Sequence, residues 1–106
     1  MKSRFHEAAQ RDLTDNFRYY NEATVGLGDQ LVAEIRAAVE YLETYPEGAP
    51  VVAGPIRAKA LVRFPHSLLY VVEKGEVVIL AIAHQRQDFD EWLRVARDRR
   101  RPSNSP

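Results

Sequence analysis

The segment Ile56–His84 reads IRAKALVRFPHSLLYVVEKGEVVILAIAH, and it decides the fold. Apolar and polar residues alternate at its start, as they do in a β-strand with one buried face. Two tight turns then interrupt the segment, at Pro65-His66 and at Lys74-Gly75. Because short turns join neighbouring antiparallel strands, we predict a three-stranded antiparallel meander. Its predicted strands are Ile56–Phe64, Ser67–Glu73 and Glu76–His84.

The third predicted strand contains the densest apolar run in the chain, Val77–Ala83. A strand that alternates would bury only one face, whereas a continuous apolar run indicates burial on both faces. We therefore expect this strand to lie at the centre of the sheet.

Two helices are predicted before the meander. Their apolar residues recur every three or four positions, which places them on one helical face. In the first helix they are Ala9, Leu13, Phe17 and Tyr20, and in the second Leu27, Leu31, Ile35, Ala38, Leu42 and Tyr45. Gly26 and Gly28 mark a break between the helices, and Pro46 ends the second. A short break of this kind predicts an antiparallel helical hairpin.

The remaining segments complete an α+β prediction. Lys2–Phe5 is expected to form an N-terminal strand, Glu47–Pro55 a loop and Asp88–Arg97 a short C-terminal helix. The predicted sheet carries the hairpin on one face and leaves the opposite face partly open. Residues 1–98 are expected to form a single domain, and residues 99–106 a disordered basic tail.

The composition excludes several classes of protein. The chain has 106 residues, with 15 Lys and Arg, 15 Asp and Glu, and a formal net charge of zero. Zero net charge disfavours broad nucleic-acid binding, since that affinity comes mainly from excess cations. With 0 cysteines and no apolar run near 20 residues, the sequence favours a cytoplasmic location and no membrane association.

The zero net charge is an average over two halves of opposite sign. Residues 1–56 contain five basic and nine acidic residues, a net charge of −4, and residues 57–106 contain ten basic and six acidic, a net charge of +4. This division suggests two surfaces for differently charged partners, although scattered charge is an equally good interpretation.

Most of the candidate binding residues are cationic. Arg57, Lys59 and Arg63 are expected on one face of a strand, with His84 and Arg86 at the end of the third strand. Such a cluster can bind a phosphate backbone or an acidic protein segment, and the alternative is an ordinary solvated face. Trp92 is expected to fill the core under the last helix, with recognition as the second possibility. The three histidines lack metal-ligand spacing, so neither a metal nor a cofactor is expected.

Several segments together resemble the RelE/ParE superfamily of bacterial type II toxin-antitoxin toxins. They are Gly26–Asp29, Tyr45-Pro46, Ile56-Arg57, Val62–His66, Leu69–Val72, Val78–Arg86 and Trp92. The resemblance extends to about Arg97 and implies the same order of strand, helical hairpin and meander.

The resemblance leaves the activity open between two branches. The ParE-like branch, which poisons DNA gyrase by binding protein, is favoured because two groups expected of a nuclease are absent. In the other branch, a metal-independent endoribonuclease cleaves mRNA on the ribosome, and the catalytic candidates are Lys59, Arg63, His84 and Arg86. An inactive antitoxin-binding relative is a third possibility.

The resemblance also implies partners for this chain. A cognate antitoxin is expected to cover the basic strand face and Arg86, and growth inhibition and plasmid stabilisation would follow from the pair. Gyrase is the expected target, with the ribosome and mRNA as the alternative. Sequence-specific DNA binding by the toxin alone is not expected.

Overall fold

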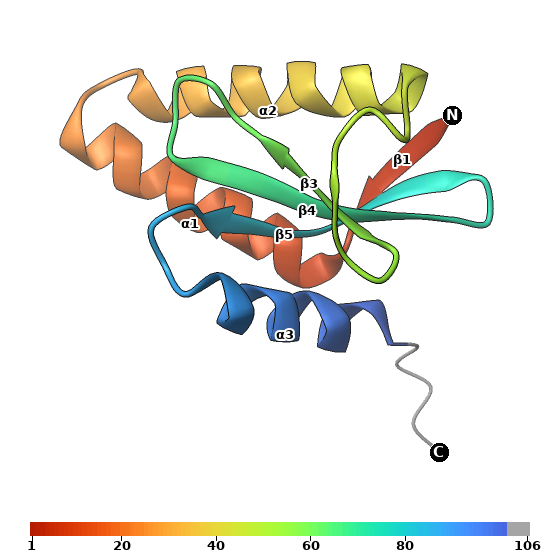
Figure 1. Cartoon of the computed structure of the whole chain (residues 1–106). Helices are drawn as coiled ribbons and strands as arrows, with labels where there is room; N and C mark the ends of the chain where they lie inside the picture. Colours follow the sequence, from red (N-terminus) through yellow and green to blue (C-terminus); the bar gives the residue numbers. More distant parts are fainter. Residues whose placement is uncertain (102–106) are drawn as a thin grey trace.

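A computed structural model describes residues 1–101 of the chain, and it has the predicted α+β architecture (Figure 1). Its elements are β1 (Lys2–Phe5), α1 (Glu7–Ala23), α2 (Leu27–Thr44), β2 (Val51–Ala53), β3 (Ile56–Ala60), β4 (His66–Glu73), β5 (Glu76–His84) and α3 (Phe89–Arg100). The N-terminal strand, the helical hairpin, the meander and the C-terminal helix are therefore confirmed.

The five strands form one sheet in the order β1-β5-β4-β3-β2. The meander β3-β4-β5 is antiparallel, and β1 adds to β5 in parallel orientation. The predicted central position of the apolar run is confirmed, because β5 lies between β1 and β4 and its residues Val77–Ala83 are buried.

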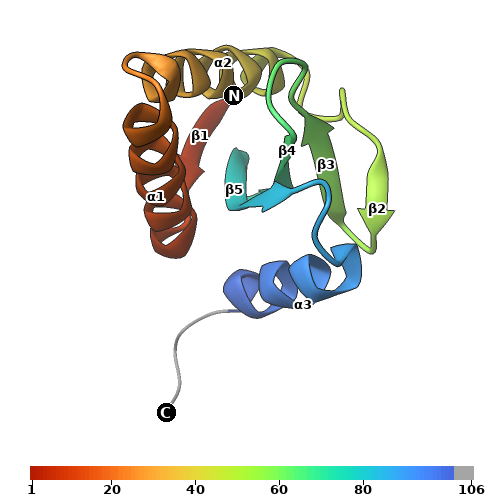
Figure 2. The same ribbon diagram turned by 90° about the vertical axis from the view of Figure 1, so that its left-hand side faces the viewer.

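Helices cover both faces of the sheet, as Figure 2 shows with α1 and α2 on one side and α3 on the other. The hairpin side has a core in which Leu31, Ile35 and Leu42 of α2 pack with β-strand residues such as Tyr70 and Ile79. On the other side, Leu93 and Ala96 of α3 belong to a second core. The face that was expected to be partly open is therefore partly covered by the C-terminal helix.

Close contact between α1 and α2 depends on Gly28. Its backbone N–H donates a 2.7 Å hydrogen bond to the Oδ1 atom of Asn21. A Cβ atom at this position would collide with the backbone oxygen of Phe17 and would lie 2.9 Å from Cγ of Asn21. The second glycine of the predicted break is thus required by helix packing.

Three boundaries differ from the sequence predictions. The expected loop Glu47–Pro55 contains the short edge strand β2, and the first meander strand ends at Ala60 instead of Phe64. The C-terminal helix continues to Arg100, so the first two residues of the expected tail belong to α3. Residues 102–106 of that tail lie outside the described part of the chain.

None of the helices within residues 1–101 is long and apolar enough to cross a membrane.

Candidate functional site

The predicted binding residues lie at separate places in the structure. Arg57 and Lys59 are on β3, Arg63 is in the loop between β3 and β4, and Trp92 is on α3. His84 ends β5, and Arg86 follows it in the turn that leads to α3. The prediction that Arg57, Lys59 and Arg63 share one strand face is wrong for Arg63, because the strand ends before it.

Arg57 and Lys59 point to the hairpin side of the sheet, near the end of α2. A terminal nitrogen of Arg57 donates a 2.8 Å hydrogen bond to the carbonyl oxygen of Ala49. The ammonium group of Lys59 lies 4.7 Å from the centre of the Tyr41 ring, which is a cation–π arrangement. Both cations are therefore held by contacts within the chain.

Arg63 is fixed to α2 through its backbone and its side chain. Its N–H donates to both carboxylate oxygens of Glu34, at 3.2 and 3.3 Å, and the Val62 N–H donates to the same carboxylate. Its guanidinium donates a 2.7 Å hydrogen bond to Gln30. The Glu34 carboxylate thus supplies an acceptor for two amides of the loop that follows β3, where no strand partner among the described residues provides one.

His84 lies directly opposite His66, a residue that the sequence placed in a turn. The two residues pair across β4 and β5, and their rings meet edge to face with centres 5.1 Å apart. His66 is buried, and its Nε2 atom lies 3.1 Å from the hydroxyl oxygen of Tyr20. Burial, aided by the nearby His84, lowers the pKa of His66 to about 4. The alternation with Leu68 and Tyr70 is the signal that could have placed His66 inside.

The turn that carries Arg86 is tied to the loop before β4. Gln85 donates from its backbone to the oxygen of Pro65 at 2.8 Å and from its side chain to the oxygen of His66 at 2.9 Å. The Arg86 N–H donates to Nδ1 of His84 at 3.0 Å, while the Arg86 residue is exposed. Arg63, His84 and Arg86 thus belong to the same end of the sheet.

Trp92 is half-buried and packs against the core under α3. Its indole N–H donates a 2.7 Å hydrogen bond to Gln87, and the ring lines a cavity of about 340 Å³ together with Asp88, Glu91 and Val95. The structural interpretation of Trp92 is therefore supported, and one side of the ring also borders a cavity.

The four nuclease candidates do not form one connected group of side chains. Lys59 lies over Tyr41, the Arg63 guanidinium donates to Gln30, and the His84 ring accepts from the backbone N–H of Arg86. Among the described residues, no hydrogen bond or ion pair joins the side chains of Lys59, Arg63 and Arg86 to one another. The arrangement presents separate cations to a partner surface instead of one connected acid-base group.

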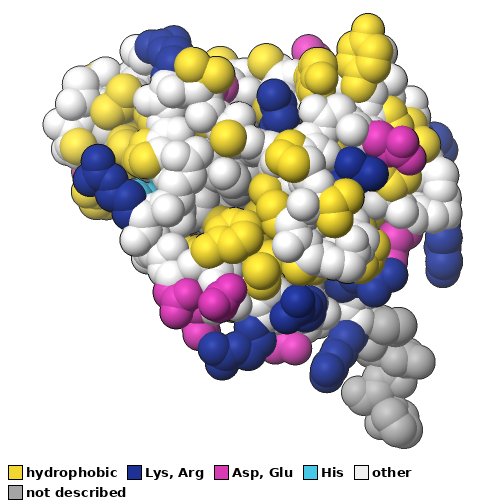
Figure 3. Space-filling view, in the orientation of Figure 1, with side chains coloured by type: hydrophobic (Ala, Val, Ile, Leu, Met, Phe, Trp, Pro, Cys, Tyr) yellow, Lys and Arg dark blue, Asp and Glu magenta, His cyan; other side chains and the backbone are white. Residues whose placement is uncertain are grey.

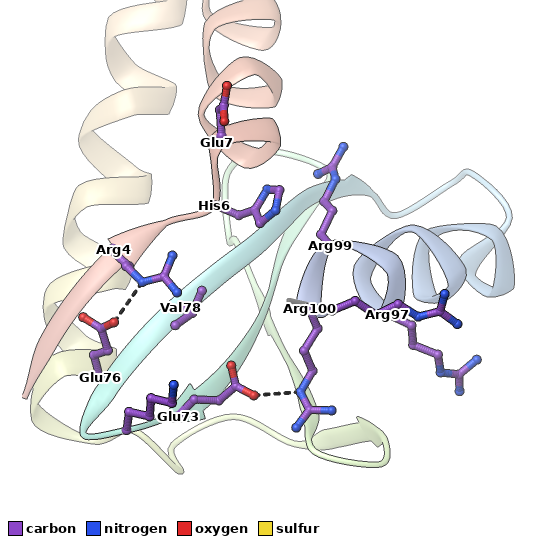
Figure 4. Close-up of a pocket in the computed structure, with 11 residues that line it drawn as sticks. Arg4, His6, Glu7, Glu73, Glu76, Val78, Arg97, Arg99 and Arg100 are labelled. Carbon is purple, nitrogen blue, oxygen red and sulfur yellow. Dashed lines mark hydrogen bonds and ion pairs between the residues drawn. The ribbon is translucent and has the colours of Figure 1, made fainter. Parts of the chain in front are cut away.

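A larger cavity, of about 720 Å³, lies away from all the predicted residues (Figure 4). It is bounded by β1, by the turn between β4 and β5, and by the C-terminal end of α3. Arg99, Arg100 and Arg101 line it, although the sequence assigned them to a tail. The ion-pair partners of Arg99 and Arg100, which are Asp12 and Glu73, are too distant in sequence to have indicated that these arginines are ordered.

The fold and a long stretch of the sequence match known toxins. The chain is similar over 79% of its length to 95% of a chain from a structure described as "Chromosomal ParDE TA system from P. aeruginosa", with a TM-score of 0.70 and 25% sequence identity. No curated protein sequence matches the chain significantly. Residues 4–89 match the family described as "ParE toxin of type II toxin-antitoxin system, parDE". The chain therefore belongs to the ParE toxin family of type II toxin-antitoxin systems.

Proposed function

We propose that this chain is a toxin that a cognate antitoxin neutralises and that inhibits growth by binding DNA gyrase. The observation that carries the proposal is the ParE family match over residues 4–89, together with the similarity to a chain of a ParDE structure. A location in the cytoplasm, where gyrase and a co-expressed antitoxin would both be present, is part of the same proposal.

Two features support binding over mRNA cleavage as the mode of action. The candidate nuclease groups contact different neighbours, with Lys59 over Tyr41 and Arg63 on Gln30. General acid-base chemistry needs groups that reach the same reacting atoms, whereas a protein interface can use cations that lie apart. The zero net charge of the whole chain also limits its affinity, in isolation, for a phosphate-rich ribosomal site.

The sheet end that carries Arg63, His84 and Arg86 is our proposed contact surface for antitoxin or target. Arg86 is exposed there, and the bonds of Gln85 to Pro65 and His66 hold its turn in place. Arg57 and Lys59 on β3, on the hairpin side of the sheet, and Trp92 on α3 are proposed as further contact residues at separate places on the surface. A rigid, charged and exposed surface meets the needs of a protein partner.

Expression of the chain with and without its antitoxin tests the activity. We expect growth arrest, gyrase-dependent DNA breaks and a DNA-damage response in the absence of antitoxin, and intact mRNA. Purified toxin should inhibit supercoiling by gyrase. Cleavage of mRNA on ribosomes without gyrase inhibition would refute the proposed target, and a lack of any toxicity would support an inactive relative.

Charge reversal tests the contact surface. Arg86→Glu should weaken antitoxin or gyrase binding by tenfold or more while leaving the free energy of unfolding within about 0.5 kcal/mol of the parent value. Arg36→Glu, at an exposed position of α2, is the matched control. Affinity for the antitoxin that stays constant from low to high salt would exclude an interface led by charge.

A further inference from the structure

The cavity between β1 and the end of α3 is rich in cations. Six Lys or Arg side chains line it, against three Glu. The cations are Arg4, Lys74, Arg97, Arg99, Arg100 and Arg101. We propose that this basic cavity binds the phosphate backbone of duplex DNA without reading its sequence.

The ion pairs inside the basic cavity leave donors free for a ligand. Arg4 binds Glu76 through its Nε atom at 2.8 Å, and Arg100 binds Glu73 through its Nε atom at 2.9 Å. Each guanidinium has five N–H donors, so these pairs leave the terminal nitrogens of both arginines available. Figure 4 shows the terminal nitrogens of Arg4 above Val78, on the side toward the cavity.

Three further cations have no ion pair among the described residues, namely Lys74, Arg97 and Arg101. In Figure 4 Arg97 extends outward from α3 at the rim of the basic cavity. Figure 3 shows Lys and Arg side chains along the lower edge of the molecule, toward the C-terminal end of α3. Arginines in a last helical turn do complement the helix dipole, but Lys74 comes from a different element.

Lys74 supplies a second, independent observation. It lies in the turn between β4 and β5 with a φ of 52°, a left-handed conformation in which Asn and Gly are far more common than Lys. A lysine here accepts local backbone strain while it places an ammonium group at the basic cavity. Lys74 thus brings a cation to the basic cavity from the β4-β5 turn, independently of α3.

The positive potential of the basic cavity also affects the pKa of His6, whose ring lies beside Arg99 in Figure 4. Burial lowers the pKa of His6, and the charges of Arg99 and Arg4 lower it further. Repulsion of a proton by these arginines implies attraction for an anion at the same place.

The lining favours a phosphate backbone over an acidic peptide or a free nucleotide. Val78 is the one described lining residue with an apolar side chain, so a peptide would find no anchor of the kind that dominates protein interfaces. The described lining contains no Phe, Tyr or Trp on which a base could stack. Repeated phosphates of a duplex need only the charges that are present.

The assignment to DNA rests on the proposed function, because a toxin that binds gyrase approaches a duplex held by that enzyme. The chain has no net charge, so we expect weak affinity in isolation, with a Kd on the order of 10 µM in about 50 mM salt. Inside a complex with gyrase the high effective concentration of DNA would make such a contact sufficient.

Fluorescence anisotropy of a labelled DNA duplex of random sequence, titrated with the purified toxin, tests the inference. The variant Lys74→Asn/Arg97→Gln keeps a residue that tolerates the left-handed turn and should raise the Kd by about tenfold. It should also reduce the slope of log K against log salt by about one for each cation removed. The control Arg18→Gln/Arg36→Gln changes the net charge equally at exposed positions of α1 and α2 and should bind like the parent.

Several results would overturn the inference. They are equal losses in both double variants, no binding by the parent at low salt, or displacement of the duplex by micromolar ATP. Tighter binding of a poly-glutamate peptide or of an RNA duplex would also contradict the assignment to DNA. A supercoiling assay run separately keeps the two proposals distinct, since gyrase inhibition without DNA binding refutes only this one.

Discussion

Asp12 of α1 and Arg99 of α3 form a 2.7 Å ion pair that joins elements 87 residues apart in the chain. The two side chains are only 16% and 17% exposed. The Asp12 carboxylate also accepts the backbone N–H of Ile82, and Arg99 donates to the oxygen of Leu80. One pair of side chains therefore holds α1, β5 and α3 together.

Removal of one partner of this pair should lower the stability of the fold. We expect Asp12→Ala to lower the free energy of unfolding by about 2–3 kcal/mol, because it leaves a mostly buried guanidinium without its counter-charge and the Ile82 N–H without its acceptor. Urea denaturation measures this loss, and a double-mutant cycle with Arg99→Met should show a coupling of at least about 1 kcal/mol. Additive losses would contradict a direct interaction.

The buried His66 predicts a loss of stability in acid. Its pKa is about 4 in the fold, below the ordinary value of 6.5 that we expect in the unfolded chain. The unfolded state therefore binds more protons between these values, so stability falls as the pH drops from 6.5 toward 4. The maximal loss is about 3 kcal/mol.

Urea unfolding at pH 7 and at pH 4.5 measures the contribution of His66. His66→Phe should reduce the difference between the two free energies, although it also removes the partner of the Tyr20 hydroxyl. His6 has a lowered pKa as well, so His6→Asn serves as the control, because asparagine keeps the capping role at the start of α1. If His66→Phe keeps the full pH dependence, His66 is not its source.

The meander was readable from the sequence because its signals are local. The strand β5 was predicted with its observed bounds, since its apolar run lies between a Lys-Gly turn and a polar segment. In contrast, the residues after Ala60 form a loop whose N–H groups, at Val62 and Arg63, bind the carboxylate of Glu34 from α2. The alternation of apolar and polar residues continues to Phe64, so it does not indicate this interaction.

The same distinction applies to the site and to the tail. Exposed cations such as Arg86 were found by residue type, whereas the burial of His66 depends on its contact with Tyr20 of α1, which lies 46 residues away in the chain. Arg99 was assigned to a disordered run of arginines because its partner Asp12 lies near the other end of the chain. Charge patterns identify candidates, but tertiary contacts decide which charges are bound and which remain available.

The close contact of α1 with Gly28 predicts an unusual effect of a common stabilising substitution. Gly→Ala in a helix usually gains up to about 1 kcal/mol, but here the added Cβ would collide with the Phe17 oxygen. We expect Gly28→Ala to lose about 2 kcal/mol instead, and Gly28→Ser to lose at least as much. Thermal unfolding distinguishes the signs, and a raised Tm in Gly28→Ala would contradict the packing described.

The hydrogen bonds of Glu34 predict that this residue stabilises the loop that carries Arg63. The Glu34 carboxylate accepts the N–H groups of Val62 and Arg63, so Glu34→Ala should expose both amides and cost about 1–2 kcal/mol. Hydrogen exchange should speed up at least tenfold at these two amides while those of β5 change only with global stability.

Glu34→Gln retains one acceptor oxygen and should show an intermediate effect, and Glu40→Ala on the exposed face of α2 should show none. Unchanged exchange in Glu34→Ala would mean that the loop is held by the burial of Leu61 and Phe64 instead. If Glu34 does hold the loop, the alanine variant should also weaken any partner that contacts Arg63, because the guanidinium loses its fixed position.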